Sequence, residues 1–111
     1  MKQLSGHDLL VLHASAGATR PLLLDVRESW EFEIAAIRVE GLRTLHIPMN
    51  ALPDRLDELD AAQPVVCICH HGVRSAQVVA FLERRGFDAV YNLAGGIAAW
   101  TAQVDAEVPA Y

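Results

Sequence analysis

The feature that most constrains this chain is a run of apolar residues that leads directly into a short polar loop. Residues 65–69 (Val-Val-Cys-Ile-Cys) show no polar alternation, which is typical of a strand buried on both faces between helices. After the loop at residues 70–74, the residues Ser75, Val78, Val79 and Leu82 follow the i, i+3, i+4, i+7 spacing of one helix face. Gly86 then follows at the position where a glycine commonly ends a helix. The pattern therefore places Cys69 where a buried strand ends and a helix is about to begin.

The thiolate is the reactive form of cysteine, and the start of a helix stabilises it. A free thiol has a pKa of about 8.5, and a helix dipole lowers such a value by only about one unit. Backbone N–H groups of residues 70–75 turned toward the sulfur would add about 1.5–3 kcal/mol each, and Gly72 would allow the necessary tight turn. We therefore predict that Cys69 is a nucleophile held as a thiolate by its own loop. Cys67 is expected in the core, with a role as a resolving thiol as the alternative.

The other elements follow from hydrophobic spacing and from turn residues. Further strands are predicted over residues 22–26, 44–47 and 89–93. Helices are predicted over 6–14 with Ser5 as N-cap, over 28–36 with Trp30, Ile34 and Ile37 facing inward, over about 50–59 with Asn50 as N-cap, over 75–85, and over about 96–103 with Trp100 in the core. Strands that alternate with helices indicate an α/β fold with a largely parallel sheet.

Asp25 and Arg27 lie at the end of the predicted strand over residues 22–26. In α/β proteins this edge of the sheet is where ligands bind. A salt bridge that holds the loop together is the expected role of the pair, with ligand binding as the alternative.

Composition narrows the functional classes. The 111 residues are predicted to form one domain, 1–111, and the net charge of −5 argues against binding to nucleic acid or to an anionic membrane. No apolar run approaches the roughly 18–20 residues of a membrane span. Two cysteines two residues apart give no disulfide framework and suit a reducing compartment, so a cytoplasmic location is expected.

Four segments resemble the single-domain rhodaneses, or thiosulfate sulfurtransferases, in the order of that family. They are residues 23–28 (Leu-Leu-Asp-Val-Arg-Glu), 69–75 (Cys-His-His-Gly-Val-Arg-Ser), 85–91 (Arg-Gly-Phe-Asp-Ala-Val-Tyr) and 92–100 (Asn-Leu-Ala-Gly-Gly-Ile-Ala-Ala-Trp). The resemblance implies a three-layer fold, with a mostly parallel sheet of about five strands flanked by helices on both faces. It also implies a six-residue loop that begins with a persulfide-forming cysteine. Residues 35–42 depart from the family's usual Gly-His-Ile turn, at one wall of the expected pocket.

The resemblance further implies a double displacement that needs neither metal nor cofactor. Cys69 would take a sulfane sulfur from a small anionic donor such as thiosulfate and pass it to cyanide or a thiol, possibly a thiol of another protein. The substrate-binding residues would be His70, His71, Gly72, Val73, Arg74 and Ser75. Arg74 is the first candidate to meet the anionic donor and His71 the second, whereas His70 is expected to point elsewhere.

Other functions remain open. Cys-dependent phosphatases and arsenate reductases use a similar loop but resemble Cys-x5-Arg, whereas Arg74 follows Cys69 with the shorter spacing Cys-x4-Arg, which favours a single sulfur atom. A persulfide relay, or a partner-binding module with incidental activity, is a further alternative. A metal site at Cys67, Cys69, His70 and His71 is disfavoured because neighbouring His side chains diverge and no second pair follows at zinc spacing.

Overall fold

Five parallel strands form a sheet at the centre of the computed structural model, which describes residues 2–15, 17 and 19–111. In the order β1-β5-β4-β2-β3 across the sheet, they are β1 (Lys2–Leu4), β5 (Val90–Leu93), β4 (Val65–Ile68), β2 (Leu22–Asp25) and β3 (Thr44–His46). The predicted α/β fold with a sheet of about five strands is confirmed, and the four strands predicted by residue agree to within one residue at each end. The sequence pattern did not indicate β1, because a strand of two exposed residues and one half-buried residue is too short to show a periodicity.

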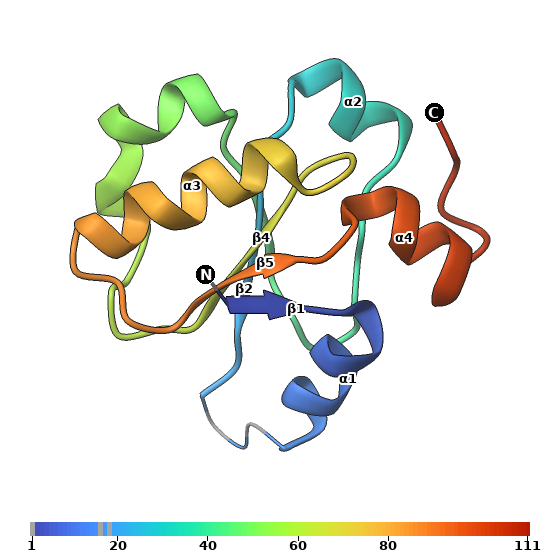
Figure 1. Cartoon of the computed structure of the whole chain (residues 1–111), viewed down its shortest axis with the longest axis horizontal. Coiled ribbons are helices and arrows are strands. Elements are labelled where there is room, and N and C mark those ends of the chain that lie inside the picture. Colours follow the sequence, from blue (N-terminus) through green and yellow to red (C-terminus); the bar gives the residue numbers. More distant parts are fainter. Residues whose placement is uncertain (1, 16, 18) are drawn as a thin grey trace.

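Helices cover both faces of the sheet (Figure 1). The helices are α1 (Gly6–Ser15), α2 (Ser29–Ile34), the 3₁₀ helix η1 (Met49–Glu58), α3 (Val73–Arg84) and α4 (Gly96–Gln103). α3 and η1 pack on one face, α1 and α4 on the other, and α2 lies beyond the end of β2. None of the helices in the described part of the chain combines the length and apolar character needed to cross a membrane.

The central strands β2 and β4 are covered on both faces, which explains their uninterrupted apolar sequences. Leu24 and Cys67, which are register partners, belong to the core under α3 and η1. Leu23 and Val66 are also register partners and belong to the core under α1 and α4. Burial of one such Leu or Val side chain contributes about 1.5–3 kcal/mol to stability. Cys67 is fully buried as predicted, and burial raises its pKa, so its thiol is inert.

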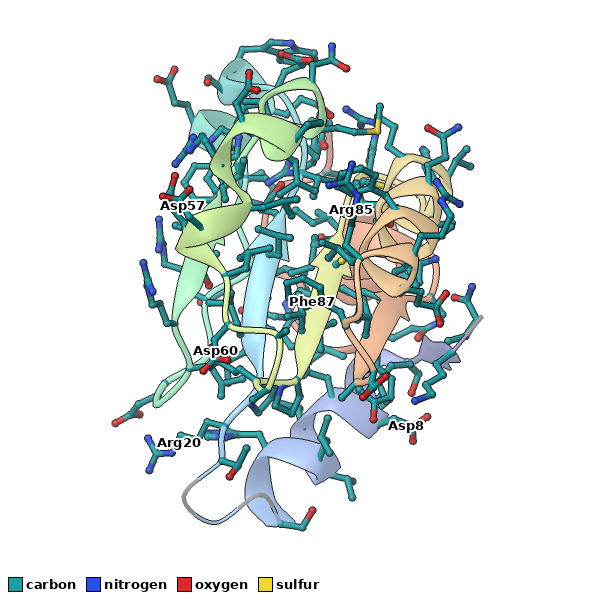
Figure 2. All side chains as sticks on the ribbon, turned by 90° about the vertical axis from the view of Figure 1, so that its left-hand side faces the viewer. Asp8, Arg20, Asp57, Asp60, Arg85 and Phe87 are labelled. Carbon is teal, nitrogen blue, oxygen red and sulfur yellow. The ribbon has the colours of Figure 1, made fainter. Side chains whose placement is uncertain are left out.

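The segment after α3 closes the core on the α3 face. The N–H groups of Gly86 and Phe87 donate to the carbonyls of Glu83 and Leu82, so Gly86 ends the helix as the sequence predicts. Figure 2 shows Phe87 between η1 and α3, in front of the sheet, where its ring belongs to the buried core.

Two helices differ from the sequence-based expectation. α2 has only six residues, and its outer face carries Trp30 and Ile34, which are 59% and 48% exposed, so their predicted inward orientation is wrong. The residue of α2 that is buried is Glu31. η1 is a 3₁₀ helix with Pro48, rather than Asn50, at its N-cap, and Pro53 inside it lacks the N–H that a regular α-helix would use. By contrast, Ser5 caps α1 as predicted, with its hydroxyl oxygen accepting from the Asp8 N–H.

Two segments that the sequence left undefined pack against the sheet layer. The departure from the family pattern at residues 35–42 is an irregular segment after α2 with a turn at residues 40–41, and its Ala35 and Ile37 are buried. Residues 104–111 fold back over α4, where Val108 joins the core and its carbonyl accepts a hydrogen bond from Thr101 Oγ1. The second segment brings Tyr111 to the end of the sheet at which β2 and β4 finish.

The start of α4 holds the loop that follows β4. The backbone N–H of Ile97 donates to the carbonyl of Cys69 at 2.9 Å, and that of Ala98 donates to the carbonyl of His70 at 3.1 Å. N–H groups in the first turn of a helix have no partner within the helix, so these bonds give partners both to the N–H groups of α4 and to the carbonyls of the loop. Gly96 has a φ of +61°, and a Cβ atom there would overlap the carbonyls of Cys69 and His70. The close approach of loop and helix therefore requires glycine at position 96.

We predict that Gly96→Ala lowers the free energy of unfolding by at least about 3 kcal/mol, because it adds overpacking to the cost of a positive φ. Gly86→Ala is the matched control, since Gly86 has a φ of +91° with open space around it. The control should lose only about 1–2 kcal/mol, the cost of a positive φ in a residue with a Cβ. Urea unfolding of both variants measures the difference, and equal losses would show that the contact with the loop is unimportant.

Candidate active site

The sulfur of Cys69 lies inside the loop that links β4 to α3. Cys69 is 1% exposed, and its Sγ accepts a hydrogen bond from the Gly72 N–H at 3.0 Å. Gly72 has a φ of +101° and is the N-cap of α3, so the turn that aims this N–H at the sulfur uses a conformation that favours glycine. The loop therefore presents a backbone donor to the sulfur, although Cys69 itself is buried beneath it.

Ser75 and Asn92 form a polar pair beside the same sulfur. The Ser75 hydroxyl lies 3.2 Å from Cys69 Sγ and also donates to Asn92 Oδ1. Asn92 Nδ2 in turn donates to the Gly72 carbonyl at 3.0 Å, so one side chain holds both the hydroxyl and the turn. Because the hydroxyl has a single proton, a thiolate at Cys69 would compete with Asn92 for it.

Asp25 and Arg27 form a buried ion pair at the end of β2. Both side chains are fully buried, and Arg27 Nη2 lies 2.7 Å from Asp25 Oδ2. Arg27 also donates to the carbonyls of Glu31 and Ala35 and to the hydroxyl of Tyr111. The pair thus ties β2 to α2, to the segment after α2 and to the end of the chain.

Arg74, the cation of the loop, is paired with Glu31 of α2. Its Nη1 and Nη2 atoms donate to Glu31 Oε1 and Oε2 at 2.6 and 2.8 Å, a bidentate contact. The hydrogen bonds from Arg74 lower the pKa of Glu31 from 4.5 to about 2, and the same contact raises the pKa of Arg74. Both groups are therefore charged at any pH at which the protein would work.

The two histidines of the loop form a stack with Tyr111. The rings of His70 and His71 are 4.0 Å apart, and Tyr111 lies 4.0 Å from His70 on a nearly parallel plane. His70 is half-buried, and burial together with the neighbouring His71 lowers its pKa, so the imidazole is neutral near pH 7. The three rings border a hollow of about 300 Å³ whose far side is formed by α4. His70 therefore takes part in a packed stack.

The structure thus brings the sequence-predicted site residues to one end of the sheet, where Val73, at the start of α3, is 69% exposed. Their roles toward a substrate stay predictions. Sequence reasoning did not single out Glu31, Asn92 or Tyr111. A polar residue inside the apolar strand β5 could have pointed to Asn92, and the Glu28 to Glu31 spacing of a capping box to Glu31. Nothing in the local sequence signals Tyr111.

The chain is similar to known proteins along most of its length. The family model described as "Rhodanese-like domain" matches residues 8–103. Thiosulfate sulfurtransferase GlpE of Actinobacillus pleuropneumoniae serotype 3 is 33% identical over 98 residues, which are 88% of this chain and 84% of that protein. The chloroplastic Rhodanese-like/PpiC domain-containing protein 12 of Arabidopsis thaliana is 37% identical over 89 residues, which are 80% of this chain but only 30% of that protein.

Solved structures agree with these similarities. The rhodanese-like domain protein of Staphylococcus aureus superposes with a TM-score of 0.76 at 29% identity, covering 100% of this chain and 99% of that one. A rhodanese-related protein of Thermoplasma volcanium gives a TM-score of 0.77 at 27% identity, with coverage of 98% and 96%.

Arg27→Lys should lower the free energy of unfolding by about 3 kcal/mol, because a lysine keeps the charge but cannot satisfy so many buried acceptors. Arg55→Lys is the control. Arg55 forms an ion pair with Glu58 at the surface, with both side chains more than a third exposed, and its replacement should change stability little. Chemical denaturation compares the two variants, and a loss at Arg27 no larger than that at Arg55 would contradict the anchoring role.

Acid should destabilise the protein through Glu31. A carboxyl whose pKa falls from 4.5 to about 2 on folding stabilises the protein above pH 4.5 and loses this contribution as the pH falls toward 2. The contribution is about 3 kcal/mol. The free energy of unfolding, measured between pH 7 and 2.5, should therefore fall more steeply with decreasing pH for the wild type than for Glu31→Gln. Glu33→Gln, at an exposed position on the same helix, should retain the wild-type slope.

Proposed function

This chain belongs to the family of rhodanese-like domains, and we propose on that basis that it is a sulfurtransferase acting through a persulfide on Cys69. It would move a sulfane sulfur from thiosulfate or a similar donor to a thiophilic acceptor, either cyanide or a thiol. We further propose that residues 1–111 act as one domain, without a metal or cofactor. The free cysteines suit a reducing compartment, so we propose a cytoplasmic location.

The observation that carries the proposal is the contact between Cys69 Sγ and the Gly72 N–H. A thiolate accepts hydrogen bonds more strongly than a thiol, so a backbone donor fixed at the sulfur favours the reactive form. The Ser75 hydroxyl, 3.2 Å away, is a second donor available to the charged sulfur. Cys67 has no such surroundings, which supports the choice of Cys69 over its neighbour.

The reaction would proceed in two displacements. In the first, the Cys69 thiolate attacks the outer sulfur of thiosulfate, the S–S bond breaks toward the inner sulfur, and sulfite leaves with the electron pair. Cys69 then carries a persulfide with one negative charge. In the second, cyanide attacks the outer sulfur of that persulfide, which gives thiocyanate and restores the thiolate. Because Cys69 is 1% exposed, the groups that cover it must move for a donor to reach the sulfur.

Phosphoryl or arsenate chemistry fits the site less well. Arg74 follows Cys69 by five positions, and the described loop turns at Gly72 to place its N–H on the sulfur. A tetrahedral oxyanion needs room above the sulfur and several donors directed at its oxygens. The Arg74 fork, which could provide two of them, is held by Glu31.

We predict that Cys69→Ser abolishes formation of thiocyanate from thiosulfate and cyanide, because the hydroxyl cannot form the persulfide. Cys67→Ser is the control, and it should retain activity because Cys67 lies in the core away from the loop. Mass spectrometry of the wild type after incubation with a donor should show an adduct of about 32 Da on Cys69. Sulfur transfer in Cys69→Ser would reject the nucleophile, and the lack of an adduct with every donor would favour a binding role.

A further inference from the structure

The loop cation is already neutralised by a carboxylate of the protein. Arg74 places both terminal nitrogens of its guanidinium on the two oxygens of Glu31, which is the arrangement an oxyanion substrate would need for itself. The Arg74 side chain is 34% exposed, whereas the Glu31 side chain is 4% exposed. Arg74 thus lies at the surface beside the loop, and we call this surface the entrance to the site. An anion that reached Arg74 would therefore meet a fixed negative charge on the far side of the same guanidinium.

Glu31 is not free to swing away from Arg74. Its Oε1 also accepts from the backbone N–H of Glu28 at 3.1 Å, and its Oε2 accepts from the hydroxyl of Tyr111 at 2.8 Å. Together with the two bonds from Arg74, four donors hold one carboxylate. Its pKa of about 2 excludes release by protonation near neutral pH. The negative charge is therefore a permanent part of the entrance.

The second guanidinium near the loop, that of Arg27, is also paired with a carboxylate of the protein. Arg27 is fully buried and is paired with Asp25 at 2.7 Å, so neither its charge nor its donors reach the entrance. His70, the nearest imidazole to Tyr111, is neutral because its pKa is lowered. Two cations and two carboxylates thus lie beside the loop, and their formal charges cancel.

We infer that Glu31, acting through Arg74, makes the site prefer sulfane donors with a single negative charge over dianions such as thiosulfate. This inference rests on the proposed sulfur transfer and names the donor class that the site favours. When Glu31 neutralises Arg74, a dianionic donor loses more electrostatic attraction to Arg74 than a monoanionic donor does, because the Coulomb energy scales with the charge of the donor. Glu31 is a positioning and specificity-determining residue, since it touches Arg74 and not the sulfur.

Two kinds of donor share this chemistry, and both reactions balance. With a thiosulfonate, R–SO₂–S⁻, the Cys69 thiolate bonds the outer sulfur, the S–S bond breaks, and the sulfinate R–SO₂⁻ leaves with the electron pair, so two negative charges stand on each side. With a persulfide anion, R–S–S⁻, the same attack on the outer sulfur gives Cys69–S–S⁻ and R–S⁻, again with two negative charges on each side. Neither step needs an oxidant or a reductant.

The test compares two donors that transfer the same outer sulfur but differ by one negative charge. Methanethiosulfonate carries a methyl group where thiosulfate carries a charged oxygen, and both donate the same outer sulfur. The measured quantity is kcat/KM for each donor, with cyanide as acceptor. The ratio of the two kcat/KM values is then compared among variants, so that the intrinsic reactivity of each donor cancels. We expect Glu31→Gln to raise kcat/KM for thiosulfate about tenfold while changing that for methanethiosulfonate less than about threefold. The persulfide of 2-mercaptoethanol forms a third arm, and it should follow methanethiosulfonate.

Glu33→Gln is the matched control. It removes one negative charge from α2 at an exposed position two residues away, so it should leave the donor ratio at the wild-type value. If Glu31→Gln does not fold, Glu31→Asp retains the charge but shortens the side chain by one methylene, which weakens its bidentate contact with Arg74. The ratio should then shift in the same direction by about twofold.

A donor ratio that stays the same in Glu31→Gln, or that shifts equally in Glu33→Gln, would overturn the inference while leaving sulfur transfer intact. Salt gives an independent readout that needs no comparison of donors. The thiosulfate rate of Glu31→Gln should fall as KCl rises, because its Arg74 charge is uncompensated, and the wild-type rate should change less. If no donor modifies Cys69 in the wild type, the proposed function fails, and the inference about Glu31 fails with it.

Discussion

The end of the sheet that carries the site depends on one buried cation. A guanidinium has five N–H donors and cannot lose its charge, so burying it requires an acceptor for each. Arg27 is fully buried and meets this requirement with Asp25, the carbonyls of Glu31 and Ala35, and the Tyr111 hydroxyl. These partners come from β2, from α2 and the residue after it, and from the far end of the chain. Satisfying one side chain therefore fixes three segments relative to one another.

The orientation of α2 follows from this arrangement. The helix turns its polar residue Glu31 inward, where the Arg74 fork and the Tyr111 hydroxyl meet it, and leaves Trp30 and Ile34 outside. Burying a charged carboxylate is costly in isolation, but four hydrogen bonds and an opposite charge offset that cost. The entrance to the site is thus built from paired charges, in a protein whose net charge is −5.

The two cysteines show how strongly the local backbone decides reactivity. Cys67 and Cys69 are two residues apart and equally hidden from solvent, yet Cys67 lies within a strand whose N–H groups pair with neighbouring strands. Cys69 lies one residue beyond β4, where the chain turns and the Gly72 N–H has no ladder partner to bond. The main chain around the loop is held by α4 through Ile97 and Ala98, and by Asn92 through the Gly72 carbonyl. The sulfur is therefore placed by backbone groups that α4 and β5 keep in position.

The sequence by itself determined the α/β class, four of the five strands, α3 with its end at Gly86, and the place of Cys69 between strand and helix. These features depend on hydrophobic period and on turn residues, which are local properties of the chain. Only the tertiary structure decided β1, the short α2 with Glu31 inside, the 3₁₀ form of η1, and the contacts of Asn92 and Tyr111. Each of these depends on partners distant in sequence: β1 pairs with β5, and Tyr111 bonds residues 80 and 84 positions away. A side chain that is polar in the sequence becomes a buried one only where such partners supply its hydrogen bonds, and periodicity carries no information about them.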